Sequence, residues 1–139
     1  MNQLKIKQYY KILSVATFLS SITFLILPNG QEISERIGPA IGINIAFHLM
    51  FQFLSRVPIG IFEQIEKSNP THRKLAHKMM TWFSIAILVI SVLGTFGFLN
   101  TVIFEQEYER LFALTIFAGV FLGGYASKLK LNEKHNGIP

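Results

Sequence analysis

Cysteine is absent from this sequence, and its absence removes several kinds of chemistry at once. Disulfide bonds, thiolate metal sites and cysteine nucleophiles are all excluded. The chain also lacks a glycine-rich phosphate loop, a nucleophile beside a partner base, and paired carboxylates within its apolar stretches. We therefore expect a protein that is not an enzyme and that binds no cofactor.

Histidine is the remaining residue that commonly binds metals or haem. His48 lies within an apolar stretch, whereas His72, His77 and His135 lie in polar segments. A haem in a membrane usually has two axial histidines at similar depth, and this spacing does not provide them. The sequence therefore predicts no metal site.

Charge is scarce, at 15% of the chain, while hydrophobic residues reach 50%. Four runs contain no Asp, Glu, Lys or Arg: residues 12–31, 37–55, 79–104 and 111–127. A soluble helical bundle needs a polar face on every helix, whereas a helix that crosses about 30 Å of hydrocarbon needs about 20 apolar residues. The runs predict an all-α integral membrane four-helix bundle. We expect one domain, residues 1–139, with helices at about 9–28, 37–57, 71–99 and 108–127.

The first run also resembles the apolar part of a cleaved secretory signal, because three lysines precede it. Its second half, ITFLILPNG at 22–30, lacks the paired small residues of a cleavage site. An uncleaved first membrane helix is therefore the better interpretation.

Basic residues are distributed unevenly over the segments that flank the runs. Eleven of the thirteen Lys and Arg residues lie in the N-terminal, middle and C-terminal segments, and only Arg36 and Arg110 lie in the two loops between. By the positive-inside rule, both termini are expected in the cytoplasm, at the bacterial cytoplasmic membrane. The net charge of +5 thus reflects topology and contact with the lipid bilayer, and nucleic acid is not an expected partner.

Two prolines mark expected helix boundaries. Pro58 is expected to bend or end the second helix. The segment PIGIFEQIEK at 58–67 then places apolar and charged residues on different faces, which predicts a short interfacial helix between helices two and three. Asn69 followed by Pro70 suits the N-cap and first position of the third helix.

Within the second run, polar residues recur at intervals of four: Asn44, His48, Gln52 and Arg56. This spacing places them in one stripe along a helix. Polar side chains that face lipid cannot form hydrogen bonds with it, which is energetically costly. We therefore expect the stripe to face protein or water. It lines a pathway or pocket in which His48 exchanges protons, or it bonds to Ser and Thr residues of neighbouring helices. Both interpretations stay open.

Small residues form two further stripes, on which helix backbones can approach closely. One lies on the second helix and one on the fourth: Gly38, Gly42 and Ala46, and Thr115, Gly119, Gly123 and Ser127. We expect these stripes to pack helices within the chain, with a homo-oligomer interface as the alternative.

These features together predict a small polytopic membrane protein that is a component of a channel or transporter for a small ion or polar solute. The alternative is a non-transporting accessory, immunity or regulatory protein that binds another membrane protein. Transport requires a wet and continuous stripe on the second helix. A partner role requires a stripe that is dry or paired.

Overall fold

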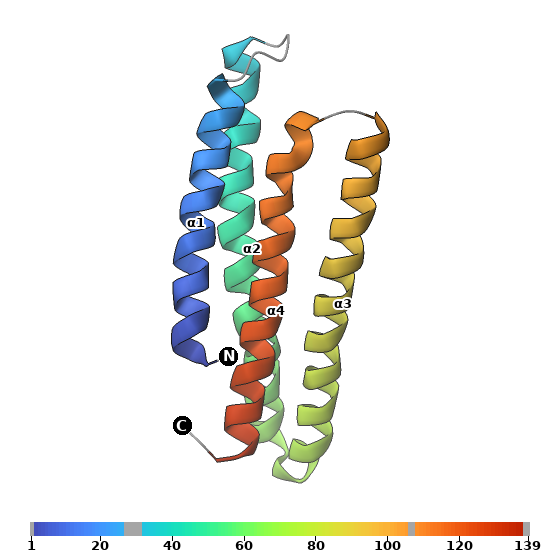
Figure 1. The fold of residues 1–139 in the computed structure, drawn as a ribbon. Coiled ribbons are helices and arrows are strands. Elements are labelled where there is room, and N and C mark those ends of the chain that lie inside the picture. The colour runs from blue at the N-terminus through green and yellow to red at the C-terminus, as the bar shows by residue number, and fades with distance from the viewer. Residues whose placement is uncertain (1, 27–31, 106–107, 138–139) are drawn as a thin grey trace.

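The computed structural model describes residues 2–26, 32–105 and 108–137 of the chain. These residues are helical almost throughout and contain no strand: α1 (Gln3–Ile26), α2 (Ile33–Ser68), α3 (Arg73–Glu105) and α4 (Leu114–His135). Short 3-10 helices precede α3 and α4: η1 (Pro70–His72) and η2 (Tyr108–Ala113). The four α-helices run alongside one another (Figure 1). Three of them, α1, α2 and α3, are long and apolar enough to cross a membrane.

α4 lies between the other helices. It packs chiefly against α2 and α3 and also against α1, and α1 and α3 stand on opposite sides of it (Figure 1). Seven of its residues are buried, among them three glycines. A helix that is sheltered by protein does not need the apolar surface that lipid demands. This position explains why α4 lacks the long apolar stretch of the other three helices.

Glycines bring α4 into close contact with its two main neighbours. A Cβ added at Gly119 would lie 2.8 Å from a ring carbon of Phe47 on α2, and one at Gly124 would lie 2.9 Å from Ile87 on α3. Contacts under about 3 Å are far closer than carbon atoms normally approach. A side chain at either position would therefore force a neighbour to shift, and α2 and α4 form a tightly packed central pair.

The C-terminal end of α2 differs from the prediction. The expected short interfacial helix does not form as a separate element, because α2 continues without a break to Ser68. Pro58 lies inside α2 and is buried, and Ile59 and Phe62 after it are buried against α3 and α4. Burial of these two side chains offsets the single backbone hydrogen bond that a proline removes from a helix.

The turn between α2 and α3 follows the local signals at Asn69 and Pro70. Pro70 occupies the start of η1, where its missing N–H is not needed. The His72 N–H donates to the Asn69 carbonyl at 3.0 Å, and the Thr71 hydroxyl donates to Asn69 Oδ1. A 3-10 turn thus comes first, and the α-helix begins at Arg73.

The helices extend beyond the uncharged runs at several ends. α1 begins at Gln3 rather than at about 9, α3 continues to Glu105, and α4 runs from Leu114 to His135. Residues 27 and 28 of the expected first helix lie outside the described residues. Lys, Arg and Glu favour helix, so charge ends a hydrocarbon-compatible segment without ending the helix. At about 1.5 Å per residue, α2 spans about 54 Å, well beyond a hydrocarbon core of about 30 Å.

Candidate functional site

The polar stripe of α2 contacts α1. His48 Nδ1 lies 2.6 Å from Tyr10 Oη, and His48 Nε2 lies 3.5 Å from Ser14 Oγ. Asn44 Nδ2 donates to Ser21 Oγ at 2.5 Å and to the Ala40 carbonyl at 2.9 Å. Asn44 and His48 are therefore both bonded to α1 in this structure.

Each ring nitrogen of His48 has its own role in this contact. We assign the Tyr10 O–H as donor to Nδ1, because a phenol is a good donor; in this tautomer the ring carries its hydrogen on Nε2. The distance from Nε2 to Ser14 Oγ is at the limit of a hydrogen bond. Tyr10 thus fixes the ring, and the Nε2–H is only weakly satisfied.

The orientation of the Asn44 amide follows from its partners. A backbone carbonyl can only accept, so the group beside the Ala40 carbonyl is the NH₂ of the amide. Both contacts of Asn44 use this NH₂ group. Its Oδ1 is therefore an acceptor without a hydrogen-bond partner in the part of the chain that the structure describes.

A groove of about 400 Å³ runs beside these polar groups, between α1 and α2. Its polar side chains are Ser21, Asn44 and His48. Its remaining lining is apolar: Phe18, Ile22, Leu25, Ala40, Ile41 and Ile45. Several of these side chains are exposed on the outer surface of their helices, including Phe18 and Ile45. The groove therefore opens sideways, where lipid would surround the protein.

Gln52 and Arg56 lie apart from this groove. Gln52 is half-buried and Arg56 is exposed, and neither lines the groove. Both lie farther along α2 toward its turn into α3. The structure thus brings Asn44 and His48 together at α1 and does not place all four stripe residues around one space.

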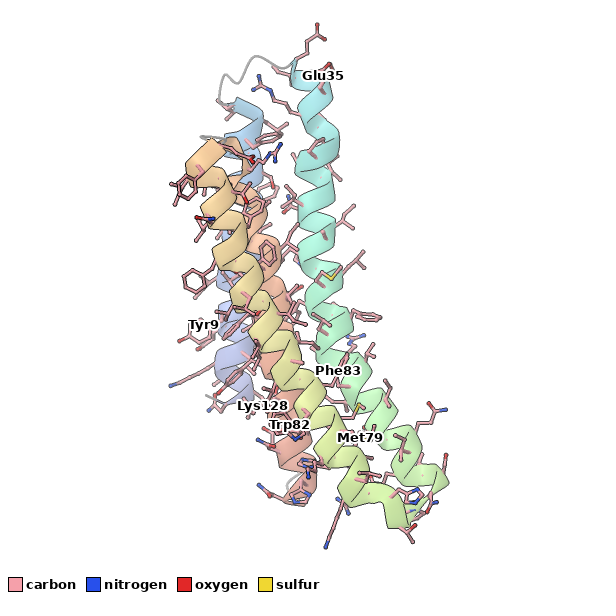
Figure 2. The ribbon with its side chains drawn as sticks, turned by 90° about the vertical axis from the view of Figure 1, so that its right-hand side faces the viewer. Tyr9, Glu35, Met79, Trp82, Phe83 and Lys128 are labelled. Carbon is pink, nitrogen blue, oxygen red and sulfur yellow. The ribbon has the colours of Figure 1, made fainter. Side chains whose placement is uncertain are left out.

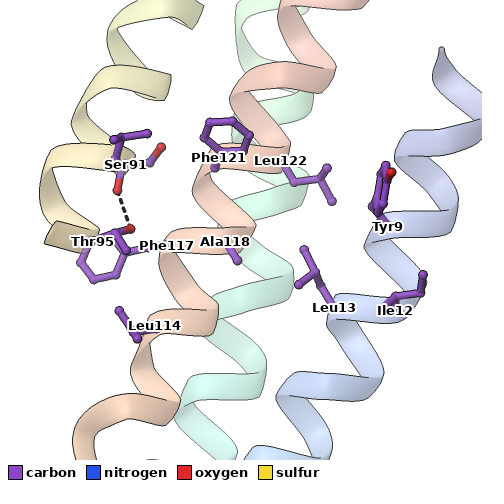
Figure 3. Close-up of a pocket in the computed structure, with 11 residues that line it drawn as sticks. Tyr9, Ile12, Leu13, Ser91, Thr95, Leu114, Phe117, Ala118, Phe121 and Leu122 are labelled. Atoms are coloured by element: carbon purple, nitrogen blue, oxygen red, sulfur yellow. Dashed lines mark hydrogen bonds between the residues drawn. The ribbon is translucent and has the colours of Figure 1, made fainter. Parts of the chain in front are cut away.

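A second groove, of about 500 Å³, lies over α4 between α1 and α3 (Figure 3). Its walls are largely apolar side chains of α1 and α4, such as Leu13, Phe117 and Phe121. On α3, the Thr95 hydroxyl donates to the Ser91 carbonyl, and the Ser91 hydroxyl donates to the Leu88 carbonyl. These hydroxyls are satisfied within their own helix, so the second groove offers mainly shape and apolar surface.

The small residues of α4 pack inside the chain. Gly119, Gly123 and Ser127 are buried, and Thr115 is half-buried. The hydroxyls of Ser127 and Ser84 lie 2.8 Å apart and join α4 to α3. This stripe thus faces α2 and α3.

The small residues of α2 lie differently. Gly38 and Gly42 are exposed, and an added Cβ at either would meet nothing within 4 Å. Ala46 is half-buried. The expected packing of Gly38 and Gly42 against another helix of the chain is therefore not met, because α2 turns Ala40 and Phe47 inward instead.

Tyr10 is the site residue that sequence reasoning missed. Its ring stacks on Phe51 at a centroid distance of 4.2 Å, and its hydroxyl meets His48. The sequence contains a pattern that points to Tyr10. The polar residues of α1 recur at helical spacing, at Tyr10, Ser14, Thr17 and Ser21. This α1 stripe runs antiparallel to the α2 stripe and pairs with it.

A separate cluster closes the end of the molecule at the α2–α3 turn. The rings of His77 and His135 stack with a centroid distance of 4.2 Å, and Phe62 packs edge-on against His77. Glu63 pairs with Lys134, and Arg73 Nη2 donates to the Lys134 carbonyl at 2.9 Å. Within the described ranges, no three His, Asp or Glu side chains gather as a metal site would require. This end therefore ties α2, α3 and α4 together.

Comparison with protein-family models, with curated proteins and with solved structures finds no match to this chain.

Proposed function

We propose that this is an integral membrane protein with four transmembrane helices and cytoplasmic termini, and that it works by binding another membrane component in the α1–α2 groove. It then belongs to the non-transporting class of accessory, immunity or regulatory membrane proteins. α4 is included as the fourth crossing because residues 111–127 carry no charge and because its neighbours shelter it.

The proposed orientation in the membrane is based on the positions of charged and aromatic residues. Glu35 lies at one end of the molecule, and Lys128 and Trp82 lie toward the other (Figure 2). Trp82 is exposed on α3, close to where the uncharged run begins. Tryptophan favours the interface and lysine the cytoplasmic side. These residues support an inner membrane surface near Trp82 and Lys128.

The observation that carries the proposal is the pairing of Asn44 and His48 with α1 beside a groove that opens sideways. A conducting path through one chain needs polar groups around a central space. The close contacts of Gly119 and Gly123 with α2 occupy the space between α2 and α4. The polar groups therefore stand where they can meet a component that approaches from the lipid.

A channel or transporter component remains the second candidate, and one surface favours it. Gly38, Gly42, Gln52 and Arg56 share an outer side of α2, and Gly38, Gly42 and Arg56 are exposed. Several copies that met along this side would enclose Gln52 and Arg56 between them. A pathway for a small ion or polar solute then requires a homo-oligomer.

Crosslinking within the membrane tests the binding proposal. A photoreactive phenylalanine analogue replaces Ile45, which is exposed and lines the groove, or Leu93, which is exposed on α3. We expect a discrete adduct from position 45 in intact cells and none of the same mass from position 93. Absence of that adduct, combined with proton or potassium flux through liposomes that contain the purified chain, would reverse the choice in favour of transport.

A further inference from the structure

Two hydrogen-bonding atoms at the α1–α2 groove lack a strong partner. Asn44 Oδ1 is an acceptor without a partner among the described residues, since both contacts of this amide use its nitrogen. In the tautomer assigned above, the His48 Nε2–H faces only the Ser14 hydroxyl, at 3.5 Å. Both residues line the groove. The groove therefore presents one donor and one acceptor to whatever occupies it.

In the proposed orientation these atoms lie deep in the hydrocarbon. Asn44 is eight residues beyond Arg36, the charged residue at the outer end of the run, which is about 12 Å along a helix. His48 lies one turn deeper. Water is scarce at this depth, and a hydrogen-bonding group without a partner is costly there.

We infer that the groove binds an uncharged lipid that carries a hydroxyl group, such as a long-chain or isoprenoid alcohol. The hydroxyl oxygen accepts from the His48 Nε2–H, and its hydrogen goes to Asn44 Oδ1. This inference rests on the proposed function, because it names the chemistry of the component that the groove binds.

A single hydroxyl group fits both atoms. Residues four apart on a helix have Cβ atoms about 5–6 Å apart, so Asn44 and His48 can reach one small group between them. A hydroxyl donates one hydrogen bond and accepts up to two. It can therefore satisfy the amide oxygen and the imidazole N–H together, which a ketone or an ether cannot do.

The rest of the groove fits a hydrocarbon chain. Phe18, Ile22 and Ile45 provide apolar walls, and none of the described residues that line the groove is charged. A phospholipid headgroup would thus find no counter-charge there and would have to leave the interface. The volume of about 400 Å³ lies within the range of about 300–1,000 Å³ for small-molecule sites. A partner helix is about 10 Å across and would need a longer surface.

Photolabelling with matched probes tests the inference. The full chain in lipid nanodiscs is exposed either to hexadecanol that carries a diazirine or to its methyl ether. Labelled residues are then mapped by mass spectrometry. We expect the alcohol to label residues 18–25 and 41–45 about fivefold more than the ether, the effect of one neutral hydrogen bond. The comparison uses the parent chain, so it does not depend on how well a variant folds.

Variants then identify the groups that hold the hydroxyl. Asn44→Leu and His48→Leu are each expected to reduce labelling by the alcohol to the level of the ether. Thr95→Val is the matched control, because it removes a hydroxyl from the other groove. It is expected to leave labelling of the α1–α2 groove unchanged.

Other outcomes overturn the inference in distinguishable ways. Equal labelling of the groove by alcohol and ether would refute recognition of the hydroxyl and leave the groove as an apolar site. Labelling spread over the whole lipid-facing surface, with a protein adduct from position 45, would replace the lipid by a protein partner and keep the proposed function. Spread labelling without any adduct from position 45 would refute both proposals.

Discussion

Tyr10 Oη lies 2.6 Å from His48 Nδ1, across the contact between α1 and α2. The bond joins residues 38 positions apart in the sequence, and in it a phenol holds a half-buried imidazole. This pair orients the ring that borders the α1–α2 groove. Its strength therefore affects both the stability of the helix pair and the position of Nε2.

Removal of the Tyr10 hydroxyl is predicted to destabilise the protein by about 1 kcal/mol, a typical value for an interhelical hydrogen bond. Tyr10→Phe keeps the ring and its stacking on Phe51, so the loss reports the bond alone. The free energy of unfolding in bilayer-like detergent measures it. In a double-mutant cycle with His48→Leu, the two losses should not add.

Tyr9 supplies the matched control for this prediction. It is the adjacent residue, but it is exposed and lines the second groove rather than contacting His48. Tyr9→Phe should leave the free energy of unfolding almost unchanged. Equal losses for the two substitutions, or fully additive losses in the cycle, would argue against the Tyr10–His48 bond.

Gly119→Ala is predicted to destabilise the chain by about 1–3 kcal/mol, the usual range for an overpacked site. The added methyl group would lie 2.8 Å from the Phe47 ring and 3.1 Å from the Phe47 carbonyl oxygen, so the helices must move apart. Gly42→Ala adds the same group where nothing lies within 4 Å. The control should be neutral or stabilising, because alanine favours helix over glycine. Thermal unfolding that ranks Gly42→Ala as the worse change would contradict the packing described for α4.

Phe62→Ala is predicted to open the end of the molecule at the α2–α3 turn. The Phe62 side chain is fully buried, and truncation of a buried phenylalanine typically costs about 3–5 kcal/mol. Limited proteolysis should show faster cleavage near residues 69–72. Ile61→Ala is the control, since Ile61 is exposed. If the two variants were cleaved equally fast, Phe62 would face lipid or water, as it would in a separate interfacial helix.

Single cysteines can test the proposed topology, because the natural chain contains none. Ser34→Cys lies in the first turn of α2, and Thr71→Cys lies in η1 at the opposite end of that helix; both positions are exposed. An impermeant thiol reagent should label position 34 in intact cells. It should label position 71 only after the cells are opened. Labelling of position 71 from outside would invert the orientation.

Much of the helical architecture is predictable from where charge is absent. The uncharged runs locate the four α-helices, because hydrocarbon tolerates few charged side chains and leaves a helix as the simplest structure. The ends of the helices are harder to predict. Pro58 is a local signal for the end of α2, but burial of Phe62 against α3 and α4 outweighs it. That burial depends on residues far away in the sequence, so it cannot be predicted from the residues around Pro58.

In the candidate site, too, some features are predictable from the sequence and others are not. The polar stripe at Asn44 and His48 is visible in the sequence, and the matching stripe that includes Tyr10 is visible as well. Their pairing depends on the antiparallel register of α1 and α2. The glycines are less predictable. Gly42 and Gly119 occur in similar local patterns, yet one is exposed and the other is buried, because only the arrangement of all the helices decides which side of each helix meets a neighbour.

The central position of α4 also has a consequence for how the chain is made. Of the four helices that the structure describes, α4 follows the other three in the chain, and it is the one on which they pack. α1 and α2 can pair early through Tyr10 and His48. Phe47 on α2 packs against Gly119, and it can make this contact only after α4 has been synthesised. If α4 crosses the membrane as proposed, it enters between helices that already stand in the bilayer. This order would let a glycine-rich segment of modest hydrophobicity take a transmembrane position that it would hold poorly alone.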